Sequence, residues 1–227
     1  MIHSVSDEFY NPILGECISY KRVSGYFSCK ALSIYAEGLD KIAENDGYVQ
    51  FIISQNISEK DFEEIKAGYH ERSKGEVLTQ IDKQRLGNLA YLISQGKADV
   101  KFGLVKNGLF HTKWGLFEDK QGDIIYFNGS LNETANAIEN NFDSFDVDFS
   151  WDVSINVRSR INQKAEEFSL LWNDNYPGVQ VIDATEIIYP LLQEFDIGKI
   201  QRIPNPDNNS IIFDMDDVQF FFVDKSE

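Results

Sequence analysis

Short hydrophobic runs alternate along the chain with stretches whose apolar residues recur every three or four positions. Three of the runs predict strands, at Tyr20 to Ser28, Tyr48 to Ser54 and Val100 to Val105. Helical spacing follows from Lys30 to about Asn45 and from Glu76 to about Gln95. Strands that alternate with helices predict an α/β fold, in which a mixed sheet is flanked by helices.

The middle of the chain adds two strands and a glycine turn. The strands are expected at Leu109 to Phe117 and Ile124 to Phe127, and Gly129 then permits a tight turn into a helix that begins at Thr134. An earlier helix is expected to start at Ser58, because its pairing with an acidic residue three positions later has the pattern of a capping box.

The last third of the chain predicts one more strand and one more helix, followed by an acidic segment. Phe145 to Trp151 alternates with period two and predicts a strand, and Val157 to Trp172 has the spacing of an amphipathic helix. A turn follows, so we expect one domain over residues 1–175 and an acidic extension over residues 176–227 that leads to a further domain or partner. Within it, Ile203 to Ser210 resembles a linker, whereas Val218 to Val223 is apolar enough to pair with a sheet or a partner.

Charge and composition narrow the classes of protein that remain. The net charge is −16, but residues 1–132 hold 18 acidic and 15 basic side chains and residues 133–227 hold 19 and 6. A local basic groove is therefore compatible with the sequence, whereas tight, indiscriminate DNA binding is not expected. No run approaches 18 apolar residues and no signal layout opens the chain, so we expect a cytoplasmic protein with no membrane partner. Cys17 and Cys29 lack a metal or redox spacing and are expected to be free thiols.

Candidate chemistry gathers around the middle strands. His111 and Lys113 lie two residues apart on a predicted strand, so both side chains should point to one face while Thr112 and Trp114 take the other. Gly129 and the following turn lead into a helix N-terminus, where backbone N–H groups bind anions. Two further side chains can donate to the same phosphate, those of Ser130 and Asn132.

Taken together, His111-x-Lys113 followed by Gly129-Ser130-x-Asn132 resembles the phospholipase D superfamily, whose members carry the HKD signature. The resemblance extends to an acidic residue eleven positions after the asparagine, which is Asp143 here where the nuclease branch usually has glutamate. The superfamily's aspartate five residues after the lysine is Glu118 in this chain. The sequence segments FNGSLNETANA and NFDSFDVDFSW are most similar to those of nuclease domains attached to helicases in bacterial restriction and anti-phage systems.

The resemblance implies a metal-independent, cofactor-free phosphodiesterase that cleaves DNA through a phosphohistidine. By that resemblance His111 is the nucleophile, Lys113, Ser130 and Asn132 hold the phosphate, and Asp143 orients the imidazole. A second histidine is required, and neither His3 nor His70 is followed by a lysine two positions on. The resemblance therefore implies a homodimer with one HKD motif in each copy, working with a helicase or ATPase in the same chain or complex.

Other interpretations remain open at the level of the sequence. A histidine and a lysine two apart on a strand are commonly ordinary surface residues, and Gly-Ser-x-Asn before a helix is commonly an N-cap. Asp146 and Asp148 fit either paired carboxylates for metal or acid/base work or an exposed strand face. In the resembled family the first strand lies near the active site, so Lys21, Arg22 and Tyr26 fit either the lining of a nucleic-acid path or a half-buried strand with exposed charges. The whole chain also fits a catalytically weak nucleic-acid-binding or dimerisation module of a larger defence complex. A lipid phosphodiesterase is disfavoured because the sequence has no basic amphipathic segment for a membrane.

Overall fold

The computed structural model describes residues 4–75, 78–106, 108–139, 143–189, 210–213 and 220–221. Its strands are β1 Cys17–Ser24, β2 Tyr48–Ser54, β3 Ile57–Ser58, β4 Ala98–Leu104, β5 Lys113–Asp119, β6 Ile124–Gly129, β7 Phe145–Phe149, β8 Gln180–Asp183, β9 Ser210–Phe213 and β10 Phe220–Phe221. Its helices are α1 Asn11–Glu16, α2 Cys29–Ile34, α3 Ala36–Glu44, α4 Glu59–Lys74, α5 Gln80–Leu86, α6 Asn88–Ser94, α7 Ala135–Glu139 and α8 Ile155–Trp172, with a π-helical turn at Ser6–Tyr10.

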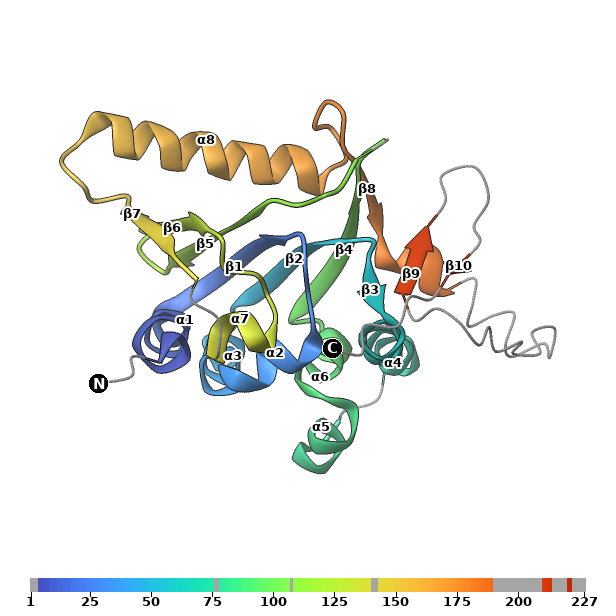
Figure 1. The fold of residues 1–227 in the computed structure, drawn as a ribbon. Coiled ribbons are helices and arrows are strands. Elements are labelled where there is room, and N and C mark those ends of the chain that lie inside the picture. The colour runs from blue at the N-terminus through green and yellow to red at the C-terminus, as the bar shows by residue number, and fades with distance from the viewer. Residues whose placement is uncertain are drawn as a thin grey trace.

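A seven-stranded mixed sheet organises these elements in the order β7-β6-β5-β1-β2-β4-β8. The three central strands β1, β2 and β4 are parallel, and β5, β6, β7 and β8 extend the sheet in antiparallel pairs at its two edges. Figure 1 shows α8 along one face of this sheet and the N-terminal helices below the other face. The predicted α/β fold, a mixed sheet flanked by helices, is confirmed.

Two hydrophobic clusters fill the two faces, because successive side chains of a strand point to opposite sides. The larger cluster joins the N-terminal helices to the sheet through residues such as Tyr20, Phe51 and Phe127. The smaller cluster lies under α8 and includes Val23 and Trp114. The expected amphipathic helix is thus present as α8, and it packs on the sheet.

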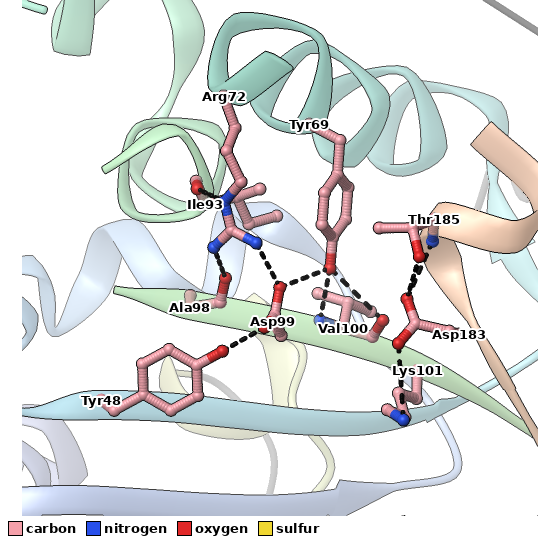
Figure 2. A network of polar contacts seen from close by, with 10 residues as sticks. All are labelled: Tyr48, Tyr69, Arg72, Ile93, Ala98, Asp99, Val100, Lys101, Asp183 and Thr185. Atoms are coloured by element: carbon pink, nitrogen blue, oxygen red, sulfur yellow. Dashed lines mark hydrogen bonds and ion pairs between the residues drawn. The ribbon is translucent and has the colours of Figure 1, made fainter. Parts of the chain in front are cut away.

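A polar network joins α4 to the sheet near the edge that is formed by β4 and β8 (Figure 2). The Asp99 carboxylate of β4 accepts hydrogen bonds from Arg72 at 2.7 Å, from the Tyr69 hydroxyl at 3.0 Å, and from the hydroxyl of Tyr48. Arg72 also donates to the backbone carbonyl of Ala98 at 2.9 Å. The network thus joins α4 to both β2 and β4.

The structure confirms one helix prediction and contradicts another. Ser58 caps α4 as expected, since its hydroxyl accepts the backbone N–H of Asp61 at 3.2 Å. The single helix expected from Glu76 to Gln95 is wrong within the described residues, because Gly87 adopts a φ of 95° and separates α5 from α6. A positive φ is unfavourable for other residues but accessible to glycine, and here it breaks the helix.

The main sheet continues past the boundary expected after residue 175. Strand β8 pairs with β4 through Val181 and Ile182, and residues 184–189 are helical. Ala184 and Ile188 are buried in the larger cluster, so this part of the expected extension belongs to the domain core. Residues 173–178 form the turn between α8 and β8.

Beyond residue 189 the structure describes two short strands. β9 pairs with β3 and with β10, so Phe220 and Phe221 of the apolar run do pair with a strand, as expected. The predicted linker from 203 to 210 lies outside the described residues except for Ser210.

Candidate active site

The predicted histidine and lysine lie together at the start of β5. The Nζ atom of Lys113 is 3.0 Å from Nε2 of His111 and donates to the backbone carbonyl of His111 at 2.8 Å. The strand begins at Lys113 rather than at Leu109 as expected, because β1 ends at Ser24, its partner in the ladder. His111 therefore lies in irregular chain beyond the sheet, where its side chain is exposed.

Gly25, in the segment that follows β1, allows His111 to lie at this position. The backbone N–H of Gly25 donates to the carbonyl of Thr112 at 2.9 Å, just after β1 ends. A Cβ atom at position 25 would lie 2.7 Å from the Cα atom of His111, closer than any side chain allows. Gly25 is thus required for the close approach of the two segments.

Aromatic and basic groups surround the pair. The ring of Tyr26 meets the His111 imidazole edge-on, with centroids 5.4 Å apart, and the Lys113 ammonium lies 5.7 Å from the same Tyr26 ring. Partial burial and the positive charge of Arg22 lower the pKa of Lys113, and the carboxylate of Asp143 acts in the opposite direction. A bound anion would relieve this unfavourable environment, so Lys113 is suited to hold a phosphate.

The other three predicted residues lie on the facing side of the same cavity. Ser130, Asn132 and Asp143 line a hollow of about 620 Å³ together with His111 and Lys113. Oδ1 of Asn132 and Oδ2 of Asp143 are buried without a hydrogen-bond partner among the described residues. Both atoms are hydrogen-bond acceptors, so they are open to a donor group.

The carboxylate of Asp143 forms a hydrogen bond with Ser130 in this structure. Its Oδ1 atom accepts a hydrogen bond from the Ser130 hydroxyl at 2.5 Å, and Ser130 in turn accepts the backbone N–H of Ser144 at 3.1 Å. Within the described part of the chain no hydrogen bond joins Asp143 to the imidazole. The Asp143 carboxylate is thus held by Ser130, whose hydroxyl also binds the backbone of the next residue, Ser144.

The helix after the glycine turn also differs from expectation. α7 begins at Ala135, later than expected, and the residues at its start line a second cavity that does not include His111. The anion site expected at this helix N-terminus is therefore absent from the cavity that holds the histidine.

A buried ion pair holds the turn in place instead. Nε of Arg22 donates to Oε2 of Glu133 at 2.7 Å, and its Nη2 donates to the backbone carbonyl of Leu131 at 2.6 Å. Both charged side chains are fully buried, and the Tyr35 hydroxyl donates to the other carboxylate oxygen of Glu133. Segment 131–133, which carries Asn132, is thereby tied to β1.

Both sequence interpretations of Arg22, a nucleic-acid path and an exposed charge, are wrong. Its two-residue spacing from the buried Tyr20 was the signal that could have placed it on the core side of β1. Lys21 takes the other side and pairs with Glu118 at 3.5 Å. Arg22 does not line the cavity but binds the backbone of the segment that carries Asn132.

Lys164 of α8 is a site residue that the sequence did not indicate. It lines the cavity, and its ammonium lies 5.0 Å from the ring of Trp114 and 2.7 Å from the Glu167 carboxylate. Nothing in the helical spacing of residues 155–172 distinguishes this lysine from the other polar residues of α8. Only the packing of α8 on the sheet brings it to the cavity.

The paired carboxylates of β7 have a structural partner. Arg160 of α8 binds Asp148 through two hydrogen bonds, of 2.6 and 2.8 Å. Among the described residues no group of three histidine, cysteine or acidic side chains is arranged to hold a metal ion. Asp146 is therefore an exposed residue of β7, whereas Asp148 is half-buried and forms an ion pair with α8.

Comparison with known proteins finds similarity only among solved structures. No family model matches the chain, and no curated protein matches it. NucT from Helicobacter pylori is 15% identical, with 79% of this chain and 92% of that chain covered and a TM-score of 0.46. Nuc, a phospholipase D family member from Salmonella typhimurium, is 14% identical, with 76% and 88% covered and a TM-score of 0.41. Yeast tyrosyl-DNA phosphodiesterase is 11% identical, with 72% and 35% covered and a TM-score of 0.41.

Proposed function

We propose that this chain is a phosphodiesterase of the phospholipase D type that cleaves DNA, with His111 as its nucleophile. The observation that carries the proposal is the contact of 3.0 Å between His111 and Lys113 at a cavity that Ser130, Asn132 and Asp143 also line. An imidazole beside an ammonium supplies both a nucleophile and a positive charge for the phosphate oxygens.

In the first step Nε2 of His111 attacks the phosphorus atom and forms a P–N bond. The P–O bond to the leaving oxygen breaks, and a second histidine donates the proton that this oxygen needs. In the second step the same histidine removes a proton from water, whose oxygen attacks phosphorus while the P–N bond breaks. The phosphate monoester leaves and both imidazoles return to their starting states.

The second histidine is assigned to a second copy of the chain. His70 lies on α4 and does not line the cavity, and His3 lies outside the described residues. A homodimer in which two His111 side chains meet across a twofold axis meets the chemical need with one motif in each chain.

Positive charge and hydrogen-bond donors are assigned to the protein itself. Lys113 neutralises the non-bridging oxygens, the amide of Asn132 donates to them, and Lys164 adds charge from α8. The hydroxyl of Ser130, which donates to Asp143 in this structure, is proposed to turn to the phosphate when the substrate binds. Because these groups supply the electrostatic stabilisation, the reaction is proposed to need no metal ion and no cofactor.

The biological role is proposed only from the resemblance of two sequence segments to a known family. The stretches FNGSLNETANA and NFDSFDVDFSW suggest a cytoplasmic nuclease of restriction or anti-phage defence that works with a helicase or ATPase in the same chain or complex. No helix in the described ranges is long and apolar enough to cross a membrane.

A second candidate is a catalytically weak DNA-binding or dimerisation module of such a complex. The observation that favours it is the position of Asp143, whose carboxylate is bound to Ser130 rather than to the imidazole. A histidine without an orienting acid lacks the carboxylate that would stabilise the positive charge formed on the imidazole, which lowers its reactivity.

Hydrolysis of bis-p-nitrophenyl phosphate and of plasmid DNA in excess EDTA distinguishes the two candidates. The wild-type chain should cleave both, and His111→Ala should lose activity by about a thousandfold or more. His70→Ala is the matched control, because it removes a histidine outside the cavity, and it should retain wild-type rates. If His111→Ala cuts as fast as the wild type, the proposed mechanism is wrong. Inactivity of the wild type would favour the binding module.

A further inference from the structure

A second cavity, of about 650 Å³, adjoins the candidate active site. Two segments run side by side from one cavity to the other: the backbone N–H of Glu133 donates to the carbonyl of Tyr26 at 3.1 Å, and the N–H of Ser28 donates to the carbonyl of Glu133 at 2.8 Å. Tyr26 contacts the ring of His111, whereas Ser28 and Thr134 line the second cavity. Asn132 lines the first cavity and Thr134 lines the second, so the two linings come within two residues of each other along the chain, at most about 7 Å.

Two lysines at the second cavity have no acidic partner. Lys30 and Lys60 both line it, both are exposed, and neither forms an ion pair with any residue in the described part of the chain. Nearby lysines differ in this respect, since Lys83 binds Asp40 and Lys41 binds Glu37. Two ammonium groups without an ion pair at one cavity are therefore available to an anionic ligand.

The acidic residues of the same cavity are occupied by the protein. Asp61 is buried, and its two oxygens accept the backbone N–H of Cys29 at 2.6 Å and the hydroxyl of Ser58 at 2.5 Å. Glu64 is partly buried and faces the backbone N–H groups of Leu89 and Ala90. Both carboxylates therefore stabilise helix starts, while the ammonium groups at the rim remain available to a ligand.

We infer that this second cavity binds the backbone of the nucleic-acid strand whose scissile phosphate lies at His111, with Lys30 and Lys60 contacting its phosphates. The inference rests on the proposed function, which supplies the strand. The polar lining of Ser28, Ser33, Asn88, Thr134 and Asn136 offers further donors to phosphate and sugar oxygens. A net negative protein can bind DNA in this way, because the contacts depend on local rather than total charge.

Binding is tested with a fluorescein-labelled single-stranded oligonucleotide and the full chain carrying His111→Ala, so that no cleavage occurs. Adding Lys30→Ala and Lys60→Ala together should raise Kd about tenfold at 0.1 M salt and should reduce the slope of log K against log salt by about 0.7 for each lysine. Lys30→Arg with Lys60→Arg keeps the charge and should bind like the parent. Lys120→Ala is the matched control, since this exposed lysine lies in the turn that follows β5, away from the Lys113 end of that strand, and the Kd of the variant should stay that of the parent.

A second readout separates this inference from the proposed function. In the catalytically active chain, the ratio of kcat/KM for the oligonucleotide to that for bis-p-nitrophenyl phosphate should fall about tenfold on Lys30→Ala with Lys60→Ala. An unchanged ratio, an unchanged Kd with the same salt slope, or a parent without affinity for the oligonucleotide would overturn the inference. Failure to hydrolyse either substrate refutes the proposed function but leaves the binding result to stand or fall by itself.

Discussion

Ser130 decides where the carboxylate of Asp143 points. Its hydroxyl donates to Asp143 and accepts from the backbone of Ser144, so the acid, the hydroxyl and the turn form one unit. Aspartate is one methylene shorter than the glutamate that the resembled nucleases usually carry at this position. The extra methylene gives a longer reach towards the imidazole from the same backbone position.

Asp143→Glu should therefore leave kcat for bis-p-nitrophenyl phosphate intact or raise it, because the longer side chain can approach His111. Asp143→Ala should lower kcat by about tenfold or more, since the imidazole then has no acid nearby to orient it. Steady-state kinetics at saturating substrate distinguish these outcomes. A tenfold loss in Asp143→Glu would mean that the short carboxylate does not act through the histidine.

At the scale of elements, the site depends on how the turn after β6 is attached to β1. Arg22 and Glu133 are 111 positions apart in sequence and form a fully buried ion pair. The guanidinium also lies 5.0 Å from the centroid of the Phe127 ring. Because the same arginine binds the carbonyl of Leu131, the pair fixes the backbone on which Asn132 is carried.

Arg22→Met should lower the free energy of unfolding by about 3–5 kcal/mol, because it leaves the Glu133 carboxylate buried without its partner. The double variant Arg22→Met with Glu133→Leu should lose much less than the sum of the single changes, since no charge is left unpaired. Urea denaturation followed by circular dichroism measures both. Lys41→Ala, which removes an exposed ion pair, is the control and should barely move the midpoint. Additive losses in the double variant would show that the pair is not coupled.

At the scale of the whole molecule, the proposed mechanism requires two chains. Each chain supplies one histidine to the cavity, and the reaction needs a second histidine as acid and base. An active site shared between two copies has a consequence that a self-contained site lacks: an inactive copy impairs its active partner.

Mixing wild-type chains with an equal amount of His111→Ala, under conditions that allow subunits to exchange, tests this point. Only dimers with two intact histidines should cleave, so the activity should fall to about one quarter of that of the same total amount of wild type. Independent sites would retain about one half. Sedimentation of the wild type and the variant at the assay concentration confirms that both form dimers; monomers with full activity would exclude the shared site.

The sequence by itself determined the alternation of strands and helices, the start of α4 and the helix α8, which follow from short-range patterns. The five residues that line one cavity were chosen by the resemblance of their motif to a known family. Side-chain alternation, helical spacing and capping act between residues a few positions apart. The motif residues are grouped because β5 and β6 are adjacent strands joined by a short turn.

Only the tertiary structure decided how distant segments meet. The Arg22–Glu133 pair, the approach of Lys164 from α8 and the pairing of β8 with β4 each join residues far apart in the chain. The same holds for the second cavity, where Lys30 and Lys60 come from different helices. No local pattern encodes these contacts, because they depend on which faces of the sheet each helix covers and on the burial that makes an ion pair or a cavity possible.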